Sequence, residues 1–311
     1  MGPRGAATGP LMSLPLMLVA VVSHAAMLSA IAPTNSAQPA AWPFLKKRLL
    51  RIYPGFIVAS LLCAFIVGPL ASVPSEYFVA FDTANFMHGV LLLDIPSIPR
   101  VFDGTPYAFV NGSMWTISRE FMCYLFVLAA GVTGLLRLRH FCLGLTVVVF
   151  AALVRFKLNN IPVVDLRLAS FFLSGACYYT YRHSIRFNGR IAAAVTVITV
   201  IGLCSWRGAE LVLASVGGYA LLYCAGKRSA LLSRFNRLPD VSYGVYLYGW
   251  PTQKLLLWYN PLMSPWALFA AAAPIAILAG AVSWYLIEKP ALRFKGPSIH
   301  LQDRPQETVT S

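Results

Sequence analysis

Long apolar runs joined by short loops dominate this chain of 311 residues. A helix that crosses a bilayer needs roughly 20 mostly apolar residues, so the shorter runs are expected to extend into their flanks. Only 12% of the residues are charged, against about 25% in a soluble domain. The sequence therefore predicts an all-α, polytopic bundle of about nine transmembrane helices. The runs lie at about 11–32, 53–72, 115–136, 141–154, 168–181, 191–206, 209–224, 241–258 and 266–287.

The basic residues predict the orientation of this bundle. Seventeen of the 25 Lys and Arg residues fall in alternate connections, around 46–51, 137–139, 182–190, 227–237 and 289–304. Loops rich in Lys and Arg face the cytoplasm, so the C-terminus is predicted to be cytoplasmic and the connection Val73–Ser113 to lie outside. The net charge of +14 is then a topology signal, and no nucleic-acid partner is expected. We expect one transmembrane domain over 1–295 and a disordered cytoplasmic tail over 296–311.

The six cysteines all lie in or beside apolar segments, and none forms a C-x-x-C pair. They are interpreted as small packing residues. No Walker loop, G-x-G-x-x-G or H-E-x-x-H motif occurs, so neither a bound metal nor a permanently bound cofactor is expected.

Glu120 is the first candidate for chemistry. The sequence from Phe121 onward is almost uninterruptedly apolar, so this carboxylate lies at the mouth of a hydrophobic span or inside it. A carboxylate at that depth needs a partner or a water-filled cavity. Helical spacing gives one polar face that points into the bundle, formed by Ser113, Thr116, Glu120 and Tyr124. The alternative is a helix-end glutamate paired with Arg119 or a lipid headgroup.

Arg48 and Arg51 are three residues apart where a predicted helix meets the cytoplasmic surface. Two guanidinium groups on one face suit bidentate capture of a diphosphate or carboxylate. The alternative is a stop-transfer cluster that reaches lipid phosphates, which is the preferred interpretation of Lys46 and Lys47.

His24 lies within the first apolar run, where it could act as a general base or simply be hydrogen-bonded in the bundle. Asp240 is a candidate N-cap for the run at 241–258, and Tyr246 lies on that run. Its aromatic hydroxyls could line a sugar or lipid groove, or serve helix packing and an interfacial belt. Glu288 and Lys289 are interpreted as ordinary end-of-helix residues.

Four segments, in this order and spacing, resemble membrane-bound acyltransferase family 3, whose members O-acylate polysaccharides, lipopolysaccharide and other glycans. The family patterns are F-x-x-R-R-x-x-R-I-x-P, N-G-S-L-W-T-L-x-x-E-x-x-x-Y, I-S-Y-G-I-Y-L-x-H-x-P and W-x-x-I-E-K-P. Gly249 stands where a histidine is frequent in the third. The corresponding segments are Phe44–Pro54 (FLKKRLLRIYP), Asn111–Tyr124 (NGSMWTISREFMCY), Val241–Pro251 (VSYGVYLYGWP) and Trp284–Pro290 (WYLIEKP).

The resemblance implies transfer of an acyl group, usually acetyl, from cytoplasmic acyl-CoA to a hydroxyl of a cell-surface carbohydrate or lipid-linked glycan. It implies a bacterial inner-membrane enzyme in which Arg48 and Arg51 hold the donor and His24 and Glu120 are catalytic. The substrate-binding residues that we infer with it are Asn111, Ser113, Trp115, Tyr124 and Tyr246.

The N-terminal part departs from the family pattern. Ser13 stands at the usual arginine position, with ten residues between it and His24, and the usual second helix has no counterpart between Met27 and Phe44. A catalytically impaired family member therefore stays open as an alternative. A glycan or glycolipid transporter stays open too, because many spans, an intramembrane carboxylate and basic loops also fit it.

Overall fold

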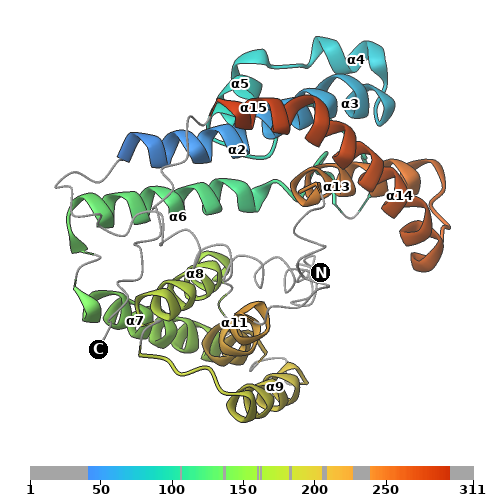
Figure 1. The fold of residues 1–311 in the computed structure, drawn as a ribbon. Helices are drawn as coiled ribbons and strands as arrows, with labels where there is room; N and C mark the ends of the chain where they lie inside the picture. Colours follow the sequence, from blue (N-terminus) through green and yellow to red (C-terminus); the bar gives the residue numbers. More distant parts are fainter. Residues whose placement is uncertain are drawn as a thin grey trace, which may run out of the picture. The chain divides into compact units, whose positions relative to one another are not determined.

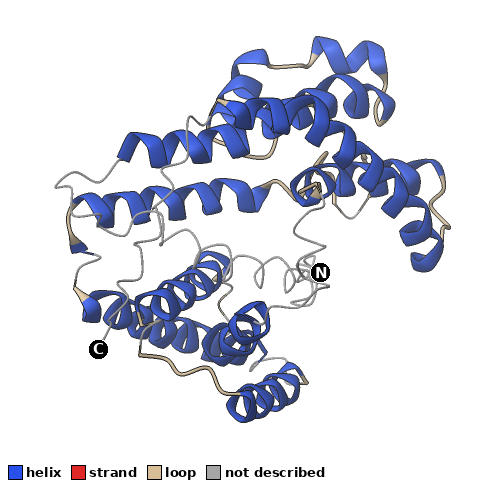
Figure 2. Cartoon of the chain, viewed as in Figure 1, coloured by secondary structure: helices blue, strands red, loops and turns tan. Residues whose placement is uncertain are grey.

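The computed structural model describes residues 41–105, 107–135, 138–159, 161, 163–181, 184–204, 209–226 and 239–294. Every regular element within these ranges is helical (Figures 1 and 2), which confirms the all-α prediction. The first predicted run, with Ser13 and His24, lies outside the described residues. The chain divides into two compact units, of which one contains Met114–Pro239 and the other contains Lys46–Ser113 and the chain from Asp240 onward.

In the first unit, every helix coincides with a predicted apolar run. α7 packs on α8, while α9 packs on the continuous helical segment α10–η3–α11. Their shared core contains Phe171, Leu213 and Ala214, with Phe150 and Leu168 against it. The elements are α6 (Trp115–Val132), α7 (Arg139–Leu158), α8 (Val164–Thr180), α9 (Gly189–Leu203), α10 (Ala209–Val212), the π-helical turn η3 (Leu213–Gly217) and α11 (Gly218–Gly226).

The second unit is built on a helical hairpin and one long helix. α13 (Ser242–Tyr259) packs along α14 (Pro265–Ser283), and a Cβ added to Gly244 would lie 2.7 Å from the Gly280 Cα, so the two backbones touch. α14 continues into the π-helical turn η4 (Trp284–Glu288) and α15 (Lys289–Arg293). The long helix is α2 (Ala41–Leu62), which continues through η1 (Cys63–Val67) into α3 (Gly68–Leu70).

The connection between α3 and α6 is folded against the second unit. It contains two short helices, α4 (Pro74–Val79) and α5 (Thr83–Leu91), and the latter is too short to cross a bilayer. Burial, together with the nearby Cys63, raises the pKa of Tyr77 to about 12, and its hydroxyl donates to the Ala64 carbonyl oxygen at 2.6 Å. Lys254 on α13 donates to Thr105 Oγ1 at 2.8 Å and lies 4.7 Å from the centre of the Phe102 ring.

Four helical segments are long and apolar enough to cross a membrane: Ala41–Leu70, Trp115–Val132, His140–Leu158 and Pro265–Arg293. Two shorter helical segments, Gly189–Leu203 and Ala209–Cys224, are also apolar. Large apolar side chains remain exposed along them, for example Val148, Ile201 and Leu278, each more than 60% exposed. Such surfaces are stable against lipid and not against water, as in a multi-pass membrane protein.

Candidate functional site

Two arginines and two carboxylates meet at one end of the second unit, where α2, α13 and η4 converge. We call Arg48, Arg51, Asp240 and Glu288 the arginine cluster. Arg48, Arg51 and Gly55 follow one another at i, i+3 and i+7 on α2, so they share a face of the helix. Arg51 Nη2 donates to Asp240 Oδ2 at 2.7 Å, and these side chains are 44% and 40% exposed.

Asp240 does not cap α13 as predicted, because Val241 occupies the N-cap position. Its carboxylate instead accepts from Ser242 Oγ at 2.6 Å and from Arg51. Partial burial alone would raise the pKa of Asp240, but the Ser242 hydrogen bonds and the positive charge of Arg51 outweigh it. The pKa therefore lies below its ordinary value, and the carboxylate is charged at neutral pH.

The interpretation of Glu288 as an ordinary end-of-helix residue is wrong. Its side chain is only 3% exposed, and Ser283 Oγ donates to Glu288 Oε1 at 3.0 Å. The Tyr248 hydroxyl donates in turn to Ser283 Oγ at 3.4 Å. A Cβ added to Gly55 would lie 3.5 Å from Glu288 Oε1, so a side chain missing from α2 makes room for the carboxyl. This sequence of polar groups leads from the arginine cluster into the core of the unit.

The Asn111-Gly-Ser113 segment docks on the middle of α13. Asn111 is fully buried, and its Nδ2 donates to the Leu247 carbonyl oxygen at 2.7 Å. Asn111 Oδ1 accepts from Ser113 Oγ at 2.6 Å, and that hydroxyl also lies 3.1 Å from the Tyr246 carbonyl oxygen. The Tyr246 hydroxyl donates back to the Ser113 carbonyl oxygen. Three residues predicted to bind substrate thus bind one another.

This docking carries non-helical backbone into the core of the second unit. Leu247 lies about 10 Å along α13 from Asp240, and Cys63, whose sulfur is 3.8 Å from Asn111 Nδ2, lies about 18 Å along α2 and η1 from Arg51. Asn111 is fully buried at this position, so its polar groups are satisfied within the protein. The connection predicted to lie outside therefore re-enters the helical unit.

The remaining predicted site residues, Trp115, Glu120 and Tyr124, lie on α6 in the first unit. The buried Tyr124 hydroxyl donates to Glu120 Oε1 one helical turn away, and the Glu120 side chain is exposed. Arg119 does not pair with Glu120, because its Nε lies 3.3 Å from Asp165 Oδ1. Glu120 and Tyr124 therefore share one face of α6, but Glu120 is exposed and Ser113 precedes the helix, so the prediction that this face points into the bundle is not confirmed. Contact of these residues with substrate stays a prediction.

Comparison with known proteins decides the family. Residues 16–287 match the acyltransferase 3 family model, described as an acyltransferase domain. The chain belongs to the acyltransferase 3 family. A curated relative, the O-acetyl transferase of Shigella phage Sf6, is 26% identical over 273 residues, which cover 83% of this chain and 79% of that protein. No solved structure matches the chain.

In this membrane acyltransferase, all four family segments contribute to the two polar sites of the second unit. Phe44–Pro54 supplies the arginines and Trp284–Pro290 supplies Glu288. Asn111–Tyr124 supplies Asn111 and Ser113, and Val241–Pro251 supplies the part of α13 on which they dock. Sequence reasoning missed Glu288 because a Glu-Lys pair after an apolar run is typical of a solvated helix end. The signal that could have identified Glu288 was its position within the family segment Trp284–Pro290.

Proposed function

We propose that this O-acyltransferase transfers an acyl group, most simply acetyl, from cytoplasmic acyl-CoA to a hydroxyl of a cell-surface carbohydrate. The observation that carries the proposal is the arrangement of the second unit. Its arginine cluster lies at one end, and the re-entrant Asn111–Ser113 segment reaches toward that cluster from the predicted outer connection. We further propose a bacterial inner-membrane location with a cytoplasmic C-terminus.

The arginine cluster suits the donor because coenzyme A carries several phosphates. Arg51 is held by Asp240 through Nη2, and its side chain remains 44% exposed. A guanidinium presents five N–H donors in a planar fork, which suits bidentate contact with a phosphate. Arg48, one helical turn before it on the same face, adds a second positive charge. Asp240 holds the Arg51 side chain in position through the Nη2 hydrogen bond.

The acceptor would approach from the opposite face, along the re-entrant segment. Asn111, Ser113 and Tyr246 hold that segment in place, so we assign them first to shaping the acceptor path. Trp115 follows two residues after Ser113, and Glu120 and Tyr124 continue along α6. We assign Trp115 and Tyr124 to contact with the acceptor and Glu120 to orienting the reacting groups or stabilising charge.

The chemical step that we propose is direct transfer. The acceptor hydroxyl oxygen attacks the thioester carbonyl carbon, a C–O bond forms, and the C–S bond breaks. His24 takes the hydroxyl proton as general base and returns it to the departing thiolate, so CoA leaves as the thiol. His24 lies outside the described residues, so this role rests only on its alignment with the histidine of the family's first helix.

The test measures transfer of labelled acetyl from acetyl-CoA to surface polysaccharide extract by purified protein in proteoliposomes. Arg51→Ala is expected to raise the KM for acetyl-CoA at least tenfold with a smaller change in kcat. Lys47→Ala is the matched control, because Lys47 lies in the same basic segment and is interpreted as a lipid contact. Equal KM values for the two variants would remove Arg51 from the donor site. Wild-type protein that cleaves no thioester would overturn the enzymatic proposal in favour of transport.

A further inference from the structure

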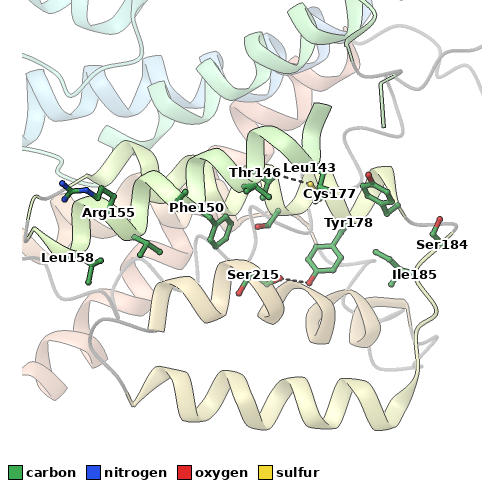
Figure 3. A pocket seen from close by; sticks show the side chains of 15 residues that line it. Leu143, Thr146, Phe150, Arg155, Leu158, Cys177, Tyr178, Ser184, Ile185 and Ser215 are labelled. Carbon is green, nitrogen blue, oxygen red and sulfur yellow. Dashed lines mark hydrogen bonds between the residues drawn. The ribbon is translucent and has the colours of Figure 1, made fainter. Parts of the chain in front are cut away.

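A long apolar groove runs along the first unit, apart from the residues assigned to acyl transfer. Its volume is about 980 Å³, and it is lined by α7, α8 and residues 184, 185 and 215 (Figure 3). On α7 the lining extends from Leu143 to Leu158, which is about 22 Å of helix. Half of a bilayer core is about 15 Å thick, so the groove is long enough for a whole lipid acyl chain.

Three hydroxyl groups in the wall are already used inside the protein. Thr146 Oγ1 donates to the Cys142 carbonyl oxygen at 2.7 Å, and Ser215 Oγ donates to the Leu211 carbonyl oxygen at 2.6 Å. The Tyr178 hydroxyl donates to the Ser215 carbonyl oxygen at 2.8 Å, which joins α8 to the π-helical turn η3. These donors are therefore not offered to a sugar, and the wall suits a hydrocarbon chain.

One end of the groove carries a positive charge that has no counterion among the described residues of this unit. Arg155, in the last turn of α7, is exposed and lies at the opposite end from Ser184 (Figure 3). Residues 114–239 contain only three acidic residues. Among the described residues, Glu210 pairs with Lys157 at 2.6 Å and with Arg167 at 2.9 Å, Asp165 pairs with Arg119, and Glu120 accepts from Tyr124. None of the described carboxylates of this unit pairs with Arg155.

We propose that this groove is a binding site for an anionic membrane phospholipid, with one acyl chain along α7 and the phosphate headgroup on Arg155. An apolar channel that ends in an uncompensated guanidinium matches a molecule with a hydrocarbon body and a negative head. Lys157 and Arg167 contribute to the positive potential at the same helix end, since the two share the single carboxylate of Glu210. This lipid site goes beyond the proposed acyl transfer and uses none of its residues.

The test is native mass spectrometry of the purified protein with phosphatidylglycerol or phosphatidylethanolamine of matched acyl chains. Wild type is expected to retain one phosphatidylglycerol molecule, and to retain it at least fivefold more than phosphatidylethanolamine. Val147→Trp fills the groove and is expected to lower retention at least fivefold. Val148→Trp is the matched control, because Val148 is similarly exposed on α7 but does not line the groove. If Val147→Trp does not fold, the smaller filling change Ala151→Phe replaces it.

Arg155→Gln tests recognition of the lipid headgroup separately from binding of the acyl chain. It is expected to remove the preference for phosphatidylglycerol while retention of phosphatidylethanolamine changes less than twofold, and Arg155→Lys is expected to restore most of the preference. Equal retention by the Val147 and Val148 variants would overturn the groove as the site. An unchanged preference in Arg155→Gln would overturn the headgroup assignment. Wild type that retains neither lipid would also overturn the proposal. A finding that another segment of the chain, such as 11–32, fills the groove would overturn it too.

Discussion

The side-chain amide of Asn111 donates a hydrogen bond of 2.7 Å to the main-chain carbonyl oxygen of Leu247. Leu247 precedes Pro251 by four residues within α13, and proline has no N–H to donate to that carbonyl. An unpaired carbonyl at a fully buried residue such as Leu247 costs free energy because no water reaches it. Asn111 therefore supplies the hydrogen bond that Pro251 removes, which explains why the asparagine is fully buried.

Asn111→Ala is expected to lower the free energy of unfolding by about 1–3 kcal/mol, because it leaves the Leu247 carbonyl buried without a donor. Pro251→Ala gives residue 251 an N–H that can reach this carbonyl. The double variant is therefore expected to lose less stability than the two single changes added together, by about 1 kcal/mol or more. Thermal unfolding of the four proteins in one detergent checks the cycle. Strictly additive losses would contradict the pairing of Asn111 with the proline-freed carbonyl.

Gly112 and Gly249 form a matched pair that tests the packing around Trp250. A Cβ added to Gly112 would lie 2.6 Å from the Trp250 ring, whereas a Cβ added to Gly249 meets nothing within 4 Å. Gly112→Ala is expected to displace the indole and lower the free energy of unfolding by about 1–3 kcal/mol. Gly249→Ala is expected to leave stability unchanged or slightly raised, because alanine favours a helix over glycine. Equal midpoints of thermal unfolding for the two variants would show that the segment at Gly112 packs differently.

The helices could largely be predicted from the sequence, because lipid solvation requires long apolar runs whatever their partners. Each predicted run within the described residues coincides with a helix. The arginine positions could be predicted too, since Arg48 and Arg51 share a face by helical spacing alone.

The pairings between helices could not be predicted. Asn111 and Leu247 are 136 residues apart, and nothing in either segment alone specifies the other. The burial of Glu288 depends on the absence of a side chain at Gly55, a feature of the packed structure and not of local pattern. Asp240 has the residue type of an N-cap, but the Arg51 guanidinium attracts its carboxylate more strongly than an exposed helix end does.

Asp240 gives a prediction for pH. Its folded-state pKa is lowered, so its pair with Arg51 stabilises the fold above the unfolded-state pKa of about 3.9 and is lost as pH falls through the lower folded-state value. Because both side chains are about 40% exposed or more, the effect is expected to stay below about 1 kcal/mol. Asp240→Asn should unfold at a lower temperature than wild type at pH 7, and the difference should vanish once the pH lies below the folded-state pKa of Asp240.

The control for this pH series is Asp103→Asn, which removes an exposed carboxylate that forms no ion pair among the described residues. Its unfolding temperature should follow that of wild type throughout. A difference between Asp240→Asn and wild type that does not shrink as the pH falls through the folded-state pKa of Asp240 would mean that the carboxylate acts through its shape and not its charge.

The carboxylate of Glu210 pairs with two cations. It is therefore expected to contribute more to the free energy of unfolding than any exposed ion pair in the same unit. Its side chain is 8% exposed, and its partners Lys157 and Arg167 are 23% and 16% exposed. Glu210→Gln leaves two partly buried positive charges next to each other, so the free energy of unfolding is expected to fall by about 3–5 kcal/mol. Asp165→Asn breaks the Arg119 pair, whose side chains are 43% and 77% exposed, and is expected to cost less than about 1 kcal/mol. Thermal unfolding in detergent at low and high salt checks both variants, and similar losses would show that Glu210 is solvated and not a buried counterion.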